Sequence, residues 1–74
     1  MQTLEFQLRP GQEYIELHKL LKFMGLAESG AEAKERVAGG GVRVDGAVER
    51  RKACKIRAGQ RVETDEVTIG VIPG

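Results

Sequence analysis

The sequence predicts an α+β domain in which two helices pack on a small, mostly antiparallel sheet. Stretches near both ends alternate polar and apolar residues, as half-buried strands do. A stripe of leucines at helical spacing follows the first stretch, and a tight turn between valines lies in the second half of the chain. With 74 residues, the chain is expected to form one domain, residues 1–74, with a small core.

The first strand and the first helix are predicted from the spacing of apolar residues. Every second residue is apolar over residues 3–8, which indicates a strand with one buried face. Over residues 13–24 the apolar residues recur at i, i+3, i+4 and i+7, which is one stripe of an amphipathic helix. Gly25 follows directly and is a natural C-cap, so this helix is expected to run from about Glu13 to Met24.

A second helix is predicted to begin at Ser29. Ser29 and Glu32 have the spacing of a capping box, in which each side chain accepts a backbone hydrogen bond at the helix start. Ala33 and Val37 would form its thin apolar face. The three glycines at 39–41 end the helix, because they cost it too much backbone entropy.

Four strands are expected after the second helix. Asp45 and Gly46, flanked by valines, suit a type I′ hairpin turn, in which both central residues have positive φ. A turn at residues 58–60 is followed by two further apolar stretches, residues 61–64 and 67–72. The predicted order of elements is therefore β-α-α-β-β-β-β.

Positive charge is concentrated in one part of the chain. Residues 34–61 hold nine basic and three acidic side chains, a local net charge of +6, whereas the whole chain has a formal net charge of +1. A near-neutral protein with one strongly positive region usually directs that region at an anionic partner. RNA is the first hypothesis for this partner.

No group of residues in the sequence predicts catalysis, a metal site or a bound cofactor, so we expect a protein that is not an enzyme. The chain has one cysteine and one histidine, so neither a zinc site nor a nucleophilic pair is predicted. Two roles stay open for Cys54: a thiol activated by the surrounding cations, or a small buried residue.

The lone thiol and the N-terminus, which is unlike a secretory signal, favour a cytoplasmic setting. No stretch is apolar enough for a membrane helix, and no small-molecule substrate is indicated.

The capped helix, the hairpin and the basic run together resemble the S-four RNA-binding domain, also called the alpha-L motif. The resemblance is carried by Ser29 at a helix start, Lys34 within that helix, GGGVRVDG at 39–46 and KIRAG at 55–59. It covers about residues 14–62 and looks closest to short bacterial members that contain little else. The family recurs in pseudouridine synthases, tyrosyl-tRNA synthetases and a ribosome-associated heat-shock protein. The resemblance implies that the second helix and the following hairpin present a basic surface to structured RNA. Association with the ribosome or a precursor of it is the expected setting.

The candidate RNA contacts combine the cations of this region with the start of the second helix. Unpaired backbone amides at a helix start attract a phosphate, so Ser29 either contributes to a phosphate site or simply caps its own helix. Arg43 lies between two valines of a predicted strand and is expected to face solvent, whereas Arg36 is expected to pair along its own helix. The candidate contacts are Ser29, Lys34, Arg43, Arg50, Arg51, Lys52, Lys55 and Arg57.

The basic run at residues 50–57 allows two interpretations. In an extended chain Arg51, Lys55 and Arg57 would share one face, and the other cations of the run would share the opposite one. These charges either bind a polyanion or form a solvated loop that keeps the domain soluble. The placement of most acidic residues outside residues 34–61 favours a polyanion.

The aromatic residues bear on the kind of RNA. Phe6, Tyr14 and Phe23 are the only aromatics, and none lies within residues 34–61. Proteins that bind single strands usually stack bases on aromatic side chains. We therefore expect recognition of phosphates and shape in a folded RNA, such as ribosomal or transfer RNA, and not recognition base by base.

Three alternatives to RNA binding stay open. A protein-interaction module would use the basic face on an acidic partner. A ubiquitin-like sulfur carrier also combines a small sheet with helices but needs a C-terminal Gly-Gly, and this chain ends Ile72-Pro73-Gly74. A binder of double-stranded DNA would need a recognition helix, and the predicted second helix is short with mixed charges.

Overall fold

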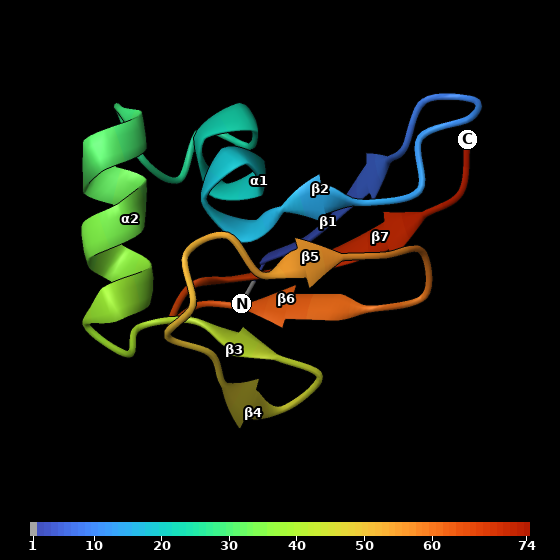
Figure 1. The fold of residues 1–74 in the computed structure, drawn as a ribbon. Coiled ribbons are helices and arrows are strands. Elements are labelled where there is room, and N and C mark those ends of the chain that lie inside the picture. The colour runs from blue at the N-terminus through green and yellow to red at the C-terminus, as the bar shows by residue number, and fades with distance from the viewer. Residues whose placement is uncertain (1) are drawn as a thin grey trace.

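The computed structural model describes residues 2–74, which form a five-stranded sheet, a two-stranded ribbon and two helices (Figure 1). In spatial order the strands of the large sheet are β1 (Gln2–Gln7), β7 (Val67–Ile72), β6 (Arg61–Glu63), β3 (Arg43–Val44) and β4 (Ala47–Val48). The helices are α1 (Leu17–Phe23) and α2 (Gly30–Ala38), and the ribbon consists of β2 (Ile15–Glu16) and β5 (Lys55–Ile56). Of these strand pairs, β1 and β7 are parallel and the others are antiparallel. The predicted α+β class, with two helices on a mostly antiparallel sheet, is confirmed.

The alternation at the N-terminus produces the predicted strand. Phe6 and Leu8 are buried, whereas Gln7 between them is exposed. β1 lies at the edge of the large sheet, where Gln7 is paired with Ile72 of the parallel strand β7. The two ends of the described chain therefore lie in neighbouring strands (Figure 1).

The prediction of a helix from Glu13 was wrong at its start. Residues 15 and 16 form β2 instead, and Ile15 is paired with Ile56 of β5. The apolar spacing could not show this, because an apolar residue at position 15 fits either structure and its strand partner lies far away in the sequence. The predicted end is correct: Met24 is the C-cap of α1, and Gly25 has a positive φ of 77°.

The capping signal places the second helix correctly. The Oγ of Ser29 accepts a hydrogen bond from the backbone N–H of Glu32 at 3.1 Å. The carboxylate of Glu32 accepts in turn from the backbone N–H of Glu28 at 3.2 Å, one residue before the cap. Ala33 and Val37 are fully buried, as their spacing predicts.

The predicted hairpin turn is confirmed by its backbone angles. Asp45 has a φ of 51° and Gly46 a φ of 88°, so both central residues have the positive φ that a type I′ turn requires. The carboxylate of Asp45 also accepts from the backbone N–H of Arg61 at 2.9 Å and from Nε2 of Gln60 at 3.1 Å. These hydrogen bonds, that of Arg61 first, lower the pKa of Asp45 and join the turn to β6.

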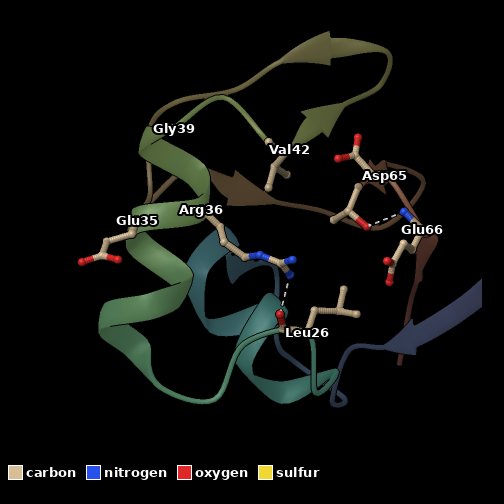
Figure 2. Close-up of a pocket in the computed structure, with 9 residues that line it drawn as sticks. Leu26, Glu35, Arg36, Gly39, Val42, Asp65 and Glu66 are labelled. Atoms are coloured by element: carbon tan, nitrogen blue, oxygen red, sulfur yellow. Dashed lines mark hydrogen bonds between the residues drawn. The ribbon is translucent and has the colours of Figure 1, made fainter.

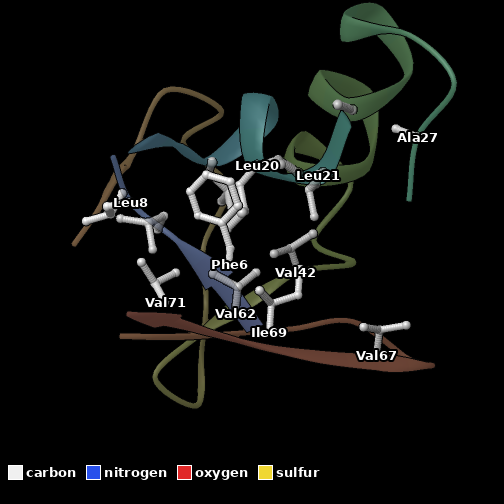
Figure 3. Packing of buried hydrophobic residues seen from close by; sticks show 14 residues of the cluster. Phe6, Leu8, Leu20, Leu21, Ala27, Val42, Val62, Val67, Ile69 and Val71 are labelled. Carbon is white, nitrogen blue, oxygen red and sulfur yellow. The ribbon is translucent and has the colours of Figure 1, made fainter. Parts of the chain in front are cut away.

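The hydrophobic core lies between the helices and one face of the large sheet (Figure 3). Leu20 and Leu21 approach it from α1, and Val62 and Ile69 approach it from the sheet. Ile56 of the ribbon is also fully buried. Burial of this side chain attaches the ribbon to the core and positions the residues on its outer side.

Candidate nucleic-acid interface

The loop between β4 and β5, residues 49–54, is anchored to the first turn of α1, and we call it the basic segment. The backbone N–H of Leu17 donates to the carbonyl oxygen of Cys54 at 2.9 Å, and that of His18 donates to the carbonyl oxygen of Lys52 at 3.0 Å. The Nδ1 of His18 lies 2.8 Å from the same oxygen, and because a carbonyl can only accept, Nδ1 is the donor. The N-cap residue Glu16 supplies no side-chain cap, so these carbonyls satisfy amides at the helix start.

Arg50 closes the C-terminal end of α2. Its Nη1 donates to the carbonyl oxygen of Ala38 at 3.2 Å. A Cβ atom at Gly40 would lie 2.9 Å from both terminal nitrogens of Arg50, so the guanidinium occupies space that only a glycine leaves free. A cation at this end of a helix also interacts favourably with the unpaired carbonyls and the helix dipole.

Arg51 is held by a neighbouring carboxylate. Its Nε and Nη2 donate to the two carboxylate oxygens of Glu49, each at 3.0 Å, and its backbone N–H donates to the same carboxylate. The side-chain hydrogen bonds from Arg51, followed by the backbone one, lower the pKa of Glu49 to about 2. Much of the charge of Arg51 is therefore balanced within the domain.

The thiol of Cys54 is not activated by the cations around it. Burial is the largest cause that raises its pKa, and the negative charge of Glu49 raises it further.

Across residues 2–74, no three side chains of the metal-binding types are grouped so that they could hold an ion. In the same residues, neither helix has the length and apolar character needed to cross a membrane.

Four exposed cations lie around the start of α1 and the ribbon that precedes it, and we call them the basic face. Within residues 2–74, their side chains form no salt bridge and no hydrogen bond. They come from α2, from the segment after β4, and from β5 and the residue that follows it. The members of the basic face are Lys34, Lys52, Lys55 and Arg57.

Lys34 and Lys52 lie near the start of α1. The carbonyl of Lys52 is held by His18, as described above. The pKa of Glu16 is lowered, mainly by Lys19, whose Nζ lies 2.9 Å from Oε1, and in smaller part by the charge of Lys34. Lys34 on α2 therefore lies near the start of α1.

The ribbon brings Tyr14 to the other two members. Ile15 and Ile56 are paired across the ribbon and pack on the core, so the residues next to them point outwards. The Nζ of Lys55 lies 5.0 Å from the ring centroid of Tyr14, and the Cζ of Arg57 lies 5.6 Å from it. The sequence-based view that the aromatics lie apart from the basic region was therefore wrong for Tyr14. Two strands of two residues each leave no sequence signal from which this pairing could be found.

Two predicted contact residues lie away from the basic face. The Oγ of Ser29 is used to cap α2 through Glu32. Arg43 is half-buried in β3, where its neighbours in register are Val48 on one side and Glu63 on the other. Neither residue is brought next to the ribbon by a contact in the described chain.

An acidic pocket lies beside the C-terminal part of α2 (Figure 2). Three residues that carry carboxylates, Glu35, Asp65 and Glu66, are among its lining residues. Arg36 also lines it, but its Nη1 donates to the carbonyl oxygen of Leu26 instead of pairing along its own helix as expected. These carboxylates repel a polyanion, so an RNA is not expected to bind at this pocket.

Comparison with known proteins identifies the family. The model of the S4 domain family matches residues 6–72, which is most of the chain. The chain belongs to the S4 domain family. This confirms the family expected from the capped helix, the hairpin and the basic run.

This S4 domain is similar to YbcJ of Escherichia coli (strain K12) and to YbcJ of Shigella flexneri. Each is 61% identical over 49 residues, which cover 66% of this chain and 70% of the relative. The solution structure of YbcJ from E. coli matches with a TM-score of 0.64 and 47% identity, covering 97% of this chain and 87% of that one. YbcJ in that structure is described as having an alpha-L motif involved in RNA binding.

Proposed function

We propose that this chain is a non-catalytic RNA-binding protein, with residues 1–74 acting as one domain that recognises structured RNA through the basic face. The observation that carries this proposal is the grouping of four exposed cations, without salt bridges in residues 2–74, around the ribbon and the start of α1. A surface of this kind favours an anionic partner. The alpha-L motif of the solved relative, described as involved in RNA binding, supports RNA as that partner.

The basic face suits a folded RNA. Its cations come from α2, a loop and the ribbon, which are held together by the core and by the contacts of His18 with Lys52. Phosphates at fixed spacing in a folded RNA can meet such an arrangement without the ordering cost of a flexible strand. Each cation that neutralises a phosphate releases counterions, so four contacts predict a slope of log affinity against log salt of about −3.

The other predicted contact residues are assigned supporting roles. We propose that Arg50 and Arg51 act by holding the basic segment, because their guanidinium groups donate to Ala38 and Glu49. Ser29 and Arg43 are proposed as additional contacts for a larger RNA, at the start of α2 and on β3.

We further propose that the RNA is of the ribosomal or transfer type. The support is the resemblance to domains of pseudouridine synthases, tyrosyl-tRNA synthetases and a ribosome-associated heat-shock protein. Association with the ribosome or a precursor of it, in the cytoplasm, is the setting that fits this resemblance.

The test is fluorescence anisotropy of the full chain with a transfer RNA, a ribosomal RNA hairpin and a DNA duplex of matched length, across a salt series. The variant Lys52→Ala/Lys55→Ala removes two cations of the basic face. The control Lys22→Ala/Arg61→Ala removes two exposed cations outside the basic face. We expect the first variant alone to bind RNA more weakly and to lose about 0.7–0.9 of the salt slope per lysine.

Two results would contradict the proposal. The first is no binding of either RNA at low salt, and the second is an equal loss of affinity in the test and control variants. Ribonuclease-resistant capture of an acidic protein, lost in the test variant alone, would favour the protein-interaction module. Preference for the duplex at equal salt would favour DNA.

A further inference from the structure

Of the three aromatic side chains, Tyr14 is the one placed at the basic face. Phe6 is buried and packs edge-on against Phe23, with ring centroids 5.2 Å apart and an interplanar angle of 81°. Phe23 is more exposed but lies against Phe6, next to β1. Tyr14 is 36% exposed and projects from the outer side of the ribbon. The residue is therefore partly exposed at a positive surface, with Lys55 and Arg57 over its ring.

The Tyr14 ring and the two cations at it match the parts of one nucleotide: the ring suits the base, and the cations suit the adjoining phosphates. Lys55 and Arg57 lie within cation–π distance of Tyr14, at 5.0 and 5.6 Å from the ring centroid. In an RNA, a base with an exposed π face is joined to phosphates on both sides. An aromatic ring that stacks the base, with cations next to it for the phosphates, is the arrangement used for unpaired nucleotides.

The ring is carried by a backbone that is held on both strands. Nε2 of Gln12 donates to the carbonyl oxygen of Tyr14 at 3.0 Å. On the other strand, the backbone N–H of Arg57 donates to Oε1 of Gln60 at 2.7 Å. Between these two points, the buried side chain of Ile56 attaches the ribbon to the core. A platform that is already ordered loses little conformational entropy when a ligand stacks on it.

We propose that Tyr14 stacks an unpaired base of the bound RNA while Lys55 and Arg57 contact the adjoining phosphates. This inference rests on the proposed function and adds a base contact to the phosphate contacts of the basic face. It predicts preference for an RNA that presents a loop or bulge beside a stem over an uninterrupted duplex.

The chain allows a direct measurement on the unmodified protein. It contains one tyrosine and no tryptophan, so its intrinsic tyrosine fluorescence reports on Tyr14 alone. We would titrate the full chain with an RNA hairpin that has an unpaired loop, and with a blunt RNA duplex matched in absorbance and phosphate number. Stacking predicts that the hairpin, at saturation, quenches the fluorescence and that the duplex does so much less.

Two variants separate the ring from its hydroxyl group. Tyr14→Leu keeps an apolar side chain but removes the ring, and it should weaken binding of the hairpin on the order of tenfold. Tyr14→Phe keeps the ring and should bind like the wild type. Binding of the duplex should be unchanged in both variants, and thermal unfolding checks that both remain folded.

The outcomes distinguish this inference from the function on which it rests. If the hairpin binds but neither quenches Tyr14 nor discriminates Tyr14→Leu from the wild type, stacking is overturned and RNA binding by the basic face stands. If the wild type binds neither RNA, both are overturned. Quenching by the hairpin together with selective loss in Tyr14→Leu supports stacking.

Discussion

The carbonyl oxygen of Lys52 accepts two hydrogen bonds from His18, one from the backbone N–H at 3.0 Å and one from Nδ1 at 2.8 Å. One residue of α1 thereby holds the loop that contains a cation of the basic face. The same contact satisfies an amide of the first helical turn, which has no side-chain cap. The position of the basic segment and the stability of α1 are therefore linked.

Replacing His18 is expected to weaken this link. His18→Ala removes the Nδ1 hydrogen bond and should lower the free energy of unfolding by about 0.5–1.5 kcal/mol. It should also weaken RNA binding, because Lys52 is then less well positioned. His18→Asn retains a side-chain donor and is the matched control. Urea unfolding measures the effect, and an alanine variant as stable as the wild type would show that the ring contributes nothing.

The Glu49–Arg51 pair predicts a dependence of stability on pH. The folded-state pKa of Glu49 is about 2, lowered from its ordinary value of 4.5, so the carboxylate binds its proton less readily in the folded chain. Its contribution is therefore present above pH 4.5 and is lost as the pH falls toward 2. The difference in unfolding free energy between the wild type and Glu49→Gln should shrink over this interval.

Urea unfolding at pH 7, 4 and 2.5 would measure this difference. Arg51→Gln is the companion variant, because Arg51 is the main cause of the lowered pKa of Glu49. In the Arg51→Gln background, Glu49→Gln should change the free energy of unfolding less, and this change should vary less with pH. A wild type and Glu49→Gln variant that differ equally at all three pH values would refute this account of the pair.

Gly40 and Gly30 should respond oppositely to alanine. Gly40 has a φ of 83°, and an added Cβ would lie 2.9 Å from the terminal nitrogens of Arg50. Gly40→Ala should therefore destabilise the fold by about 1–2 kcal/mol. At Gly30, in the first turn of α2, an added Cβ meets no atom within 4 Å. Gly30→Ala should be neutral or stabilise the fold by up to about 1 kcal/mol, and thermal unfolding of both variants tests the contrast.

RNA binding should depend on Lys52 more than on the neighbouring ion pair. The double variant Glu49→Ala/Arg51→Ala removes two opposite charges and should bind RNA with nearly the wild-type salt slope. Lys52→Ala should reduce the magnitude of that slope by about 0.7–0.9. Salt titrations by anisotropy make the comparison. A larger reduction of the salt slope in the double variant than in Lys52→Ala would identify Arg51 as a direct RNA contact.

Elements defined by short-range signals were predicted correctly. Ser29 caps α2 through a residue three positions later, and Asp45 and Gly46 form the expected turn with positive φ at both residues. The alternation over residues 3–8 produced β1, in which Phe6 is buried, and Leu8 is buried directly after it. Each of these signals acts between residues a few positions apart, so the local sequence contains the information for it.

The location of the positive region could be predicted, but the contacts that its cations make within the fold could not. Charge counts placed the positive region at residues 34–61. They could not show that the guanidinium of Arg50 reaches Ala38 at the end of α2. Nor could they separate Arg51, which is held by Glu49, from Lys52, whose side chain forms no salt bridge in residues 2–74.

The sequence by itself determined the two helices, the hairpin, the strands at both ends and the concentration of positive charge. The tertiary structure decided that Ile15 is paired with Ile56, so that a strand replaces the first predicted turn of α1. That pairing also places Tyr14 beside Lys55 and Arg57. A two-residue strand has too little pattern to specify its partner, and its pairing is stabilised by burial of Ile56 in a core that exists only in the folded chain.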